Sequence, residues 1–283
     1  MRMGFVPLPI HLPYINGWPP GKLLCARFAA RPEPGYDGDM AEHESHQSND
    51  SPLLETVSLF QGLAPAERQE VYQAAHHRAV EKGELFFVQG EEAHTLYVLT
   101  QGRVRLNQLS PEGEQVLLRV IVPGQLFGGV AVLSGTAYPA AAEAVVPSEA
   151  LGWDGETMAR LMERYPAIAR NALRLLAERI QELQERYREL ATERVERRVA
   201  SAVLRLARQT GRKVEGGILI DFPLSREDLA AMTGTTLYTV SRILKRWEKE
   251  GLVEAGRQRL LIRSPHGLVA LAEDLPPALE APS

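Results

Sequence analysis

The sequence predicts an α+β protein in which an antiparallel β-roll, a long helix and a winged helix-turn-helix follow one another. Three observations support this fold class. Short alternating segments between glycine turns occupy residues 80–153, a heptad pattern runs through 165–192, and two short helices with a glycine turn begin at Leu224. The predicted boundaries are an arm at 1–50, the roll at 51–164, the long helix at 165–193, the winged helix at 194–270 and a tail at 271–283.

The composition excludes several classes of protein. With 283 residues and 45% hydrophobic content, the chain suffices for about two globular domains. Its single cysteine, Cys25, excludes an internal disulfide framework and a Cys-rich metal site built from one chain. No apolar run approaches the roughly 20 residues that span a bilayer, and the N-terminus lacks a signal-peptide pattern. The sequence therefore predicts a cytoplasmic protein with no membrane contact and no cofactor.

The first 50 residues differ in composition from the rest of the chain. Seven prolines interrupt residues 7–34, and residues 39–50 are almost wholly polar, which predicts a disordered arm. Met40 is an alternative translation start, in which case residues 1–39 are not translated. His43 and His46 fit a solvated polar tail better than a metal site.

The roll is predicted from a change of hydrophobic period. Residues 52–79 carry apolar anchors at helical spacing, with a turn at 62–65. From Val80 onward the period becomes two, and glycine or proline turns separate the segments, which is typical of a closed antiparallel roll or barrel. The predicted strands are 84–89, 95–100, 103–110, 115–122 and 142–146.

The long helix carries two interleaved sets of apolar residues, each repeating every seven positions. They are Leu173, Ile180 and Tyr187, and Leu176, Leu183 and Leu190. Such an a/d pattern is typical of a two-chain seam, although a helix lying on its own domain also explains it. We favour a parallel homodimer, because two-fold symmetry places two DNA-reading helices about 34 Å apart, one turn of DNA.

The segment 224–242, LSREDLAAMTGTTLYTVSR, predicts the helix-turn-helix. Ser225 and Asp228 suit the start of the first helix, and Thr233-Gly234 ends it at a tight turn. In the second helix, Val240, Ile243, Leu244 and Trp247 share one buried face and leave Leu237, Tyr238, Arg242 and Lys245 outside. Two packed amphipathic helices without a DNA role would look similar. Residues 253–262 then predict a hairpin of the winged-helix type, which favours the DNA-binding interpretation.

Charge is distributed unevenly along the chain. Residues 194–263 contain 15 Lys/Arg and 8 Asp/Glu, although the whole chain has a net charge of −4. The predicted winged helix is therefore a basic module attached to an acidic remainder, as phosphate neutralisation requires. No Gly-rich phosphate loop, metal-ligand cluster or nucleophile–base pair occurs at useful spacing, so the sequence predicts no enzyme.

Together these elements resemble the CRP/FNR family of bacterial transcription regulators, over residues 53 to about 263. The resemblance is carried by Gly83-Glu84, Gly90, Leu96-Tyr97 and Gly102-Arg103-Val104, by the segment 123–128, by the heptad helix and by residues 229–252. It implies a cyclic-nucleotide-binding-like roll as a sensor domain and a homodimer on a two-fold DNA operator. RNA polymerase is a further implied partner.

The resemblance also implies which residues contact DNA. The base-reading positions of the second helix correspond to Leu237, Tyr238 and Arg242, and an arginine there binds guanine O6 and N7 bidentately. Leu237 and Tyr238 differ from the Arg-Glu pair of CRP itself, so the CRP operator sequence cannot be transferred. The corresponding candidates for phosphate contact are Arg226, Thr236, Thr239 and Lys245.

The effector pocket departs from the family pattern. Cyclic-AMP-binding members carry a Gly-Glu pair for the ribose and an Arg-Ser or Arg-Thr pair for the cyclic phosphate. Here Gly128 is followed by Gly129, Tyr138-Pro139 replaces the phosphate-binding pair, and Leu183 and Gln184 replace hydroxyl residues that contact adenine. Arg179 alone matches a basic position of that pocket. An anionic phosphate would lose its bidentate partner, so we expect DNA binding without cyclic AMP.

Three alternatives remain open at this stage. In the first, an unidentified small ligand in the roll gates the regulator. In the second, the regulator carries a haem held by His76 or His77. In the third, the chain is a nucleotide-sensing module with no role on DNA. Two adjacent histidines at the end of a helix are more often exposed than ligating. A sensor without a DNA role would not need the basic winged helix.

Overall fold

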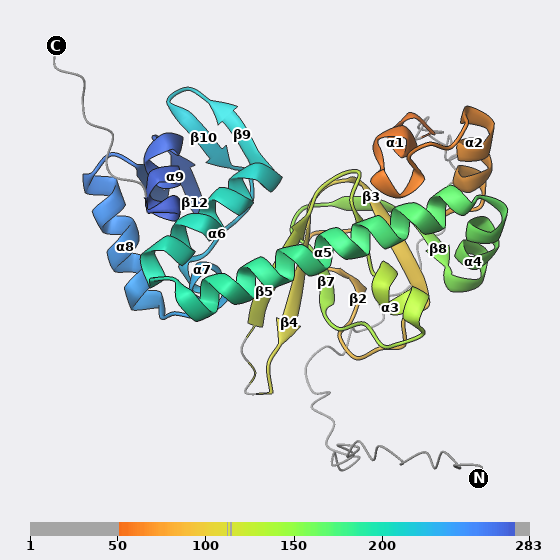
Figure 1. The fold of residues 1–283 in the computed structure, drawn as a ribbon, viewed down its shortest axis with the longest axis horizontal. Coiled ribbons are helices and arrows are strands. Elements are labelled where there is room, and N and C mark those ends of the chain that lie inside the picture. Colours follow the sequence, from red (N-terminus) through yellow and green to blue (C-terminus); the bar gives the residue numbers. More distant parts are fainter. Residues whose placement is uncertain (1–50, 112, 114, 275–283) are drawn as a thin grey trace, which may run out of the picture. The chain divides into compact units, whose positions relative to one another are not determined.

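The structure is a computed structural model that describes residues 51–274 except residues 112 and 114. The predicted arm at 1–50, with Cys25, Met40, His43 and His46, lies outside the described residues, as does the tail after residue 274. The described residues belong to one compact unit, in which the roll, a long helix and a winged helix follow in sequence order (Figure 1). The predicted α+β fold class is confirmed.

Two four-stranded antiparallel sheets form the roll. The first sheet has the order β1 (His76–Val80), β8 (Ser148–Asp154), β3 (Thr95–Gln101) and β6 (Leu126–Phe127). The second has the order β2 (Leu85–Phe87), β7 (Ala141–Ala144), β4 (Val104–Leu109) and β5 (Gln115–Ile121). Each of the five predicted strands is present, with ends that differ from the prediction by up to two residues.

Short helices cover the ends of the roll. They are α1 (Ser51–Thr56), the 3₁₀ helix η1 (Ser58–Phe60), α2 (Pro65–Gln73), α3 (Gly129–Ser134) and α4 (Gly155–Arg164). Trp153 is fully buried, and its ring packs at a tilt against Phe60 with centroids 5.4 Å apart. Its indole N–H donates to the Val71 carbonyl at 2.9 Å. This tryptophan joins β8 to the helices that precede the roll.

The helical prediction for residues 52–79 is wrong at its end. His76–Val80 is strand β1, which pairs antiparallel with β8 from His76 opposite Gly152 to Val80 opposite Ser148. The partner strand lies about 70 residues away in the sequence, so local spacing did not reveal it. His76 and His77 are therefore on an exposed strand, and do not end a helix.

The long helix α5 spans Pro166–Thr192. Its first turns pack on the roll through Ile168 and Ala172, and Pro166 occupies the first helical turn. Among the described residues, no helix combines the length and the apolar character that crossing a bilayer requires.

The winged helix begins with α6 (Val195–Thr210) and contains β9 (Gly211–Val214), β10 (Gly217–Ile220), α7 (Arg226–Met232), α8 (Leu237–Lys249), β11 (Val253–Gly256), β12 (Arg259–Ile262) and α9 (Pro265–Glu273). The predicted hairpin at 253–262 is confirmed as β11–β12. The hairpin β9–β10 was not predicted, and it extends the wing to a four-stranded sheet ordered β11-β12-β10-β9. Helix α9 continues three residues past the predicted boundary at 270, because Leu268 packs in the core of this domain.

Candidate nucleic-acid interface and effector pocket

A reciprocal cap starts α7, the first helix of the helix-turn-helix. The Asp228 backbone N–H donates to Ser225 Oγ at 2.9 Å, and the Ser225 backbone N–H donates to Asp228 Oδ2 at 2.9 Å. The helix ends at the predicted glycine turn, where Gly234 has a φ of +57°, in the left-handed region that favours glycine. The turn then leads directly into α8.

Helix α8 is held by its inner face. Val240, Ile243, Leu244 and Trp247 are all buried, as their spacing predicted. The Trp247 indole N–H donates to Glu196 Oε1 on α6 at 2.9 Å, and Arg246 pairs with the same carboxylate. Burial of this face in the core shared with α6, α7 and the wing fixes which side chains of α8 point outward.

The outer face of α8 is cationic and aromatic. Tyr238 is 85% exposed, and Arg242 and Lys245 are exposed without an ion pair to any described residue. A pocket on this surface is lined by Tyr238, Ser241, Arg242, Lys245, Arg246 and Lys249. The structure thus brings together three of the predicted DNA-contacting residues. It adds Ser241, Arg246 and Lys249, which helical spacing from Tyr238 would have identified.

The remaining predicted DNA-contacting residues lie beside this pocket or before it. Leu237 is 36% exposed at the start of α8, and Arg226 is half-buried at the start of α7. Thr236 caps α8 by accepting the Thr239 backbone N–H at 3.3 Å, and the two threonine hydroxyls lie 3.1 Å apart. Both threonines therefore have a structural role at the helix N-terminus, which is also the end that favours anions.

The seam predicted on α5 forms an exposed apolar stripe. The exposed fraction is 68% for Leu173, 55% for Ile180, 51% for Leu183, 75% for Tyr187 and 47% for Leu190, while Leu176 is half-buried. Large apolar side chains that line up on one helix face and remain open to water mark an interaction surface.

The side chain of Tyr138 is buried inside the roll. Its ring stacks on Phe87 with centroids 3.8 Å apart and an interplanar angle of 8°. Its hydroxyl donates to the Thr95 carbonyl at 2.6 Å and accepts the Thr95 backbone N–H at 3.0 Å. Burial raises the pKa of the Tyr138 phenol above its ordinary value, so the hydroxyl stays protonated as a donor. Neither Phe87 nor Thr95 was expected from the sequence, because both contacts join distant segments.

The two glycines of the candidate pocket lie close to their neighbours, whereas Pro139 lies at the surface. Gly128 has a φ of +75°, and a Cβ there would lie 3.1 Å from the Thr95 carbonyl oxygen and 3.3 Å from the Tyr138 ring. A Cβ on Gly129 would lie 3.0 Å from Leu126 Cδ2. Pro139 is exposed, and its carbonyl accepts the Gln108 side-chain amide at 3.3 Å. The aromatic core of the roll therefore abuts the short helix α3 directly.

The candidate pocket residues on α5 make no hydrogen bond or ion pair with Tyr138 among the described residues. Arg179 pairs with Glu182 at 2.6 Å, and Leu183 and Gln184 are exposed. The charge of Arg179 also acts on Arg119 of β5, which the sequence did not single out. Burial and the positive charge of Arg179 lower the pKa of the Arg119 guanidinium, whose Nε–H is buried without a partner among the described residues.

A set of contacts fixes the helix-turn-helix to the roll. Arg105 of β4 binds both carboxylate oxygens of Asp228 at 3.3 Å and lies 5.8 Å from the Phe222 ring centroid. Arg103 pairs with Asp221 at 3.2 Å. Beneath these pairs, Leu117, Val120 and Val145 of the roll belong to the same apolar core as α6, α7 and α8. We call this set the roll–helix contact.

Comparisons with known proteins place both parts of the chain. Residues 77–165 match the family model for a cyclic nucleotide-binding domain, and residues 197–271 match the Crp-like helix-turn-helix domain. The cyclic AMP receptor protein of Thermus thermophilus is 34% identical over 217 residues, 77% of this chain and 95% of that protein. The transcriptional regulator LdrP of the same species is 33% identical over 199 residues, 70% of this chain and 96% of that protein.

A solved structure agrees with these matches. The crystal structure of a CRP-family transcriptional regulator from Thermus thermophilus is 30% identical, and it covers 69% of this chain and 96% of its own with a TM-score of 0.58. A nucleotide-binding-type roll and a Crp-like helix-turn-helix in this order, with 34% identity over most of the chain, show that the protein belongs to the CRP/FNR family of transcription regulators.

Proposed function

We propose that the protein is a homodimeric regulator that binds a two-fold DNA operator sequence-specifically and without cyclic AMP. The observation that carries this proposal is the outer face of α8, where Tyr238, Arg242 and Lys245 are exposed and form no ion pair with described residues. Arg242 reads a base, and Lys245 neutralises a phosphate. Arg226, Leu237, Thr236 and Thr239 complete the DNA-facing surface.

Dimer formation is supported by the exposed stripe on α5. Five of its six seam residues are between 47% and 75% exposed in the single chain. A parallel partner helix would remove these side chains from water, which stabilises the dimer by about 25 cal/mol for each Å² of apolar area buried. It would also place two copies of α8 about one turn of DNA apart, roughly 34 Å. We further propose that the DNA-bound dimer recruits RNA polymerase and catalyses no reaction itself.

Independence from cyclic AMP is supported by Tyr138. Its ring lies on Phe87, and its hydroxyl satisfies both backbone groups of Thr95. In cyclic-AMP-binding family members the neighbouring positions supply a glutamate and an Arg-Ser or Arg-Thr pair, and this chain has Gly129 and Tyr138-Pro139. One relative is named a cyclic AMP receptor protein, whereas LdrP is named a transcriptional regulator.

The roll–helix contact supports DNA binding without a ligand. Arg105 of β4, and Leu117 and Val120 of β5, pack against α7, and in this arrangement the outer face of α8 remains exposed. A ligand changes DNA affinity only if it binds one arrangement of the two domains better than the other. Cyclic AMP lacks its usual partners here and has little differential affinity to offer.

A second candidate function is the same regulator gated by a small anion, and one observation favours it. Arg119 of β5 has a buried Nε–H without a partner among the described residues, and burial and the positive charge of Arg179 lower the pKa of its guanidinium. Glu182 is the only carboxylate that pairs with Arg179 among the described residues. A phosphate-bearing ligand would relieve the repulsion between the two guanidinium groups. Thermal unfolding with added inorganic phosphate or a nucleoside monophosphate distinguishes the candidates, because only the gated regulator gains stability at low ligand concentration.

Selection from random-sequence duplexes tests the proposed function. Nucleotide-stripped protein is expected to enrich one two-fold sequence whose half-sites are centred one DNA turn apart, and to protect that sequence from cleavage. The physical reason is that two identical α8 helices read two identical half-sites. Enrichment of no sequence, or of a single half-site only, would contradict the proposal.

A further inference from the structure

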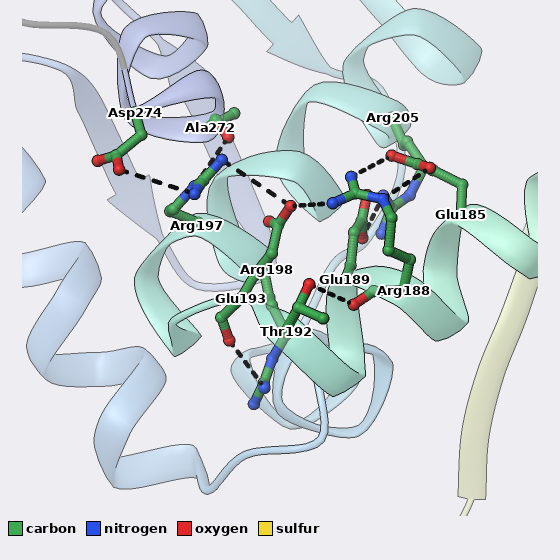
Figure 2. A network of polar contacts seen from close by, with 10 residues as sticks. All are labelled: Glu185, Arg188, Glu189, Thr192, Glu193, Arg197, Arg198, Arg205, Ala272 and Asp274. Atoms are coloured by element: carbon green, nitrogen blue, oxygen red, sulfur yellow. Dashed lines mark hydrogen bonds and ion pairs between the residues drawn. The ribbon is translucent and has the colours of Figure 1, made fainter.

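The junction between α5 and α6 is short, and Arg198 is one of the α6 side chains that bind across it. Only Glu193 and Arg194 separate the end of α5 from the start of α6. Arg198, in the first turn of α6, points back toward Glu193 (Figure 2). Its Nη1 donates to the carbonyl oxygens of Leu190 and Glu193, each at 3.3 Å. Leu190 lies in the last turn of α5 and Glu193 is the C-cap of that helix, where carbonyl acceptors lack partners within the helix.

The same guanidinium reaches the helix-turn-helix. Arg198 Nη2 donates to the Gly234 carbonyl at 3.3 Å. Gly234 lies in the turn between α7 and α8, two residues before Thr236, the cap of α8. One planar side chain thus binds the end of the seam helix and the turn that starts the DNA-reading helix.

A nearby side chain adds to this link. A Cβ built on Gly234 would lie 3.2 Å from Leu190 Cδ2, so Leu190 lies close to the turn. Leu190 is also the last residue of the seam stripe and is 47% exposed. The residue that ends the predicted dimer seam therefore lies beside the turn before α8.

We propose that Arg198 is a positioning residue that fixes the separation and orientation of the two α8 helices relative to the dimer seam. This inference rests on the proposed dimeric, DNA-binding function. The planar guanidinium of Arg198 can donate to three carbonyl oxygens at once, whereas a lysine ammonium is a compact charge without that fixed geometry. Loss of the link leaves each winged helix intact but lets its orientation vary, so binding must restrict that motion at a cost in affinity.

The competing role for Arg198 is a plain phosphate contact. If Arg198 contacts a phosphate, its replacement should weaken binding equally at every half-site separation and lower the salt slope by about one. A positioning residue would instead change how sharply affinity depends on the separation and would leave the salt slope unchanged. The two roles therefore give opposite signatures.

The test compares Arg198→Gln, Arg198→Lys and the matched control Arg197→Gln in the full chain. Arg197 is the adjacent arginine on α6. It binds the Ala272 carbonyl at 3.1 Å and faces Asp274, and its Nη2 lies 3.9 Å from Glu193 Oε1 (Figure 2). Unlike Arg198, it makes no hydrogen bond to the Gly234 carbonyl. Operator duplexes with half-sites moved together or apart by one base pair are titrated at several salt concentrations. Wild type and Arg197→Gln should prefer one separation by roughly tenfold or more, and Arg198→Gln should lose most of that preference. Arg198→Lys should not restore it.

Amide hydrogen exchange gives a second readout that needs no DNA. Arg198→Gln should speed exchange at residues 233–236 and 190–194, and Arg197→Gln should leave residues 233–236 as in the wild type. An unchanged separation preference with unchanged exchange would overturn the inference, as would equal weakening at all separations with a reduced salt slope. If the wild-type chain itself selects no two-fold site, the proposed function fails. In that case exchange at the turn still decides whether Arg198 holds the junction.

Discussion

Replacing Ile180 and Leu183 with glutamate is expected to convert the protein into a folded monomer with at least about a hundredfold weaker operator binding. Both side chains are more than half exposed in the single chain, so the substitutions leave the core of each chain intact. In a dimer, however, they would place four carboxylates in one apolar seam, where like charges repel and lose hydration. Light scattering or sedimentation measures the mass, which is 31.4 kDa for one chain.

A matched control separates the seam from charge in general. Gln181 is the exposed neighbour of Ile180 and lies outside the heptad stripe. Gln181→Glu adds the same kind of charge to the same helix, and it should leave both the dimer mass and operator affinity close to those of the wild type. If the Ile180→Glu, Leu183→Glu protein still has the mass of a dimer, the stripe on α5 is not the dimer interface.

The second large effect is expected at Arg242. Arg242→Ala should cost about 1–3 kcal/mol in binding to the selected operator and should relax the preference for one base pair in each half-site. The physical reason is the loss of a bidentate contact to a guanine edge, which no other exposed residue of α8 can replace in the same place. Fluorescence anisotropy with operators substituted at each position measures both quantities.

Lys245 provides the contrast to Arg242, because it lies on the same exposed face of α8 one turn later. Lys245→Ala should weaken binding to the operator and to random duplexes by similar factors and reduce the salt slope by about one. If Arg242→Ala also weakens operator and random DNA equally, Arg242 contacts a phosphate and does not read a base.

Features that depend on local spacing were predicted correctly from the sequence. The buried face of α8, with Val240 and Trp247 inside and Tyr238 outside, follows from the helical period of 3.6 residues, which places residues three and four apart on one face. The extent of α5 and the glycine turn at Gly234 follow from the same kind of local rule. For this reason the outer face of α8 emerged with most of its residues already named.

Features that depend on pairing between distant segments were not predicted. Arg105 and Asp228 lie 123 residues apart, and nothing in their immediate sequence indicates that they bind each other. Tyr138 and Thr95 are 43 residues apart, so the replacement of a phosphate-binding residue by tyrosine showed what was missing but not what Tyr138 contacts. Strand β1 and the arginine link at Arg198 belong to the same class.

Operator affinity of nucleotide-stripped protein, measured with and without millimolar cyclic AMP, tests the central claim most directly. The account predicts tight binding without nucleotide and the same affinity, within about threefold, after its addition, because Tyr138 and Gly129 offer no partner to the cyclic phosphate or ribose. An increase of tenfold or more, which corresponds to about 1.4 kcal/mol of coupling, would contradict it. That result would mean that cyclic AMP binds the roll through contacts other than those of the family pattern and drives the protein onto DNA.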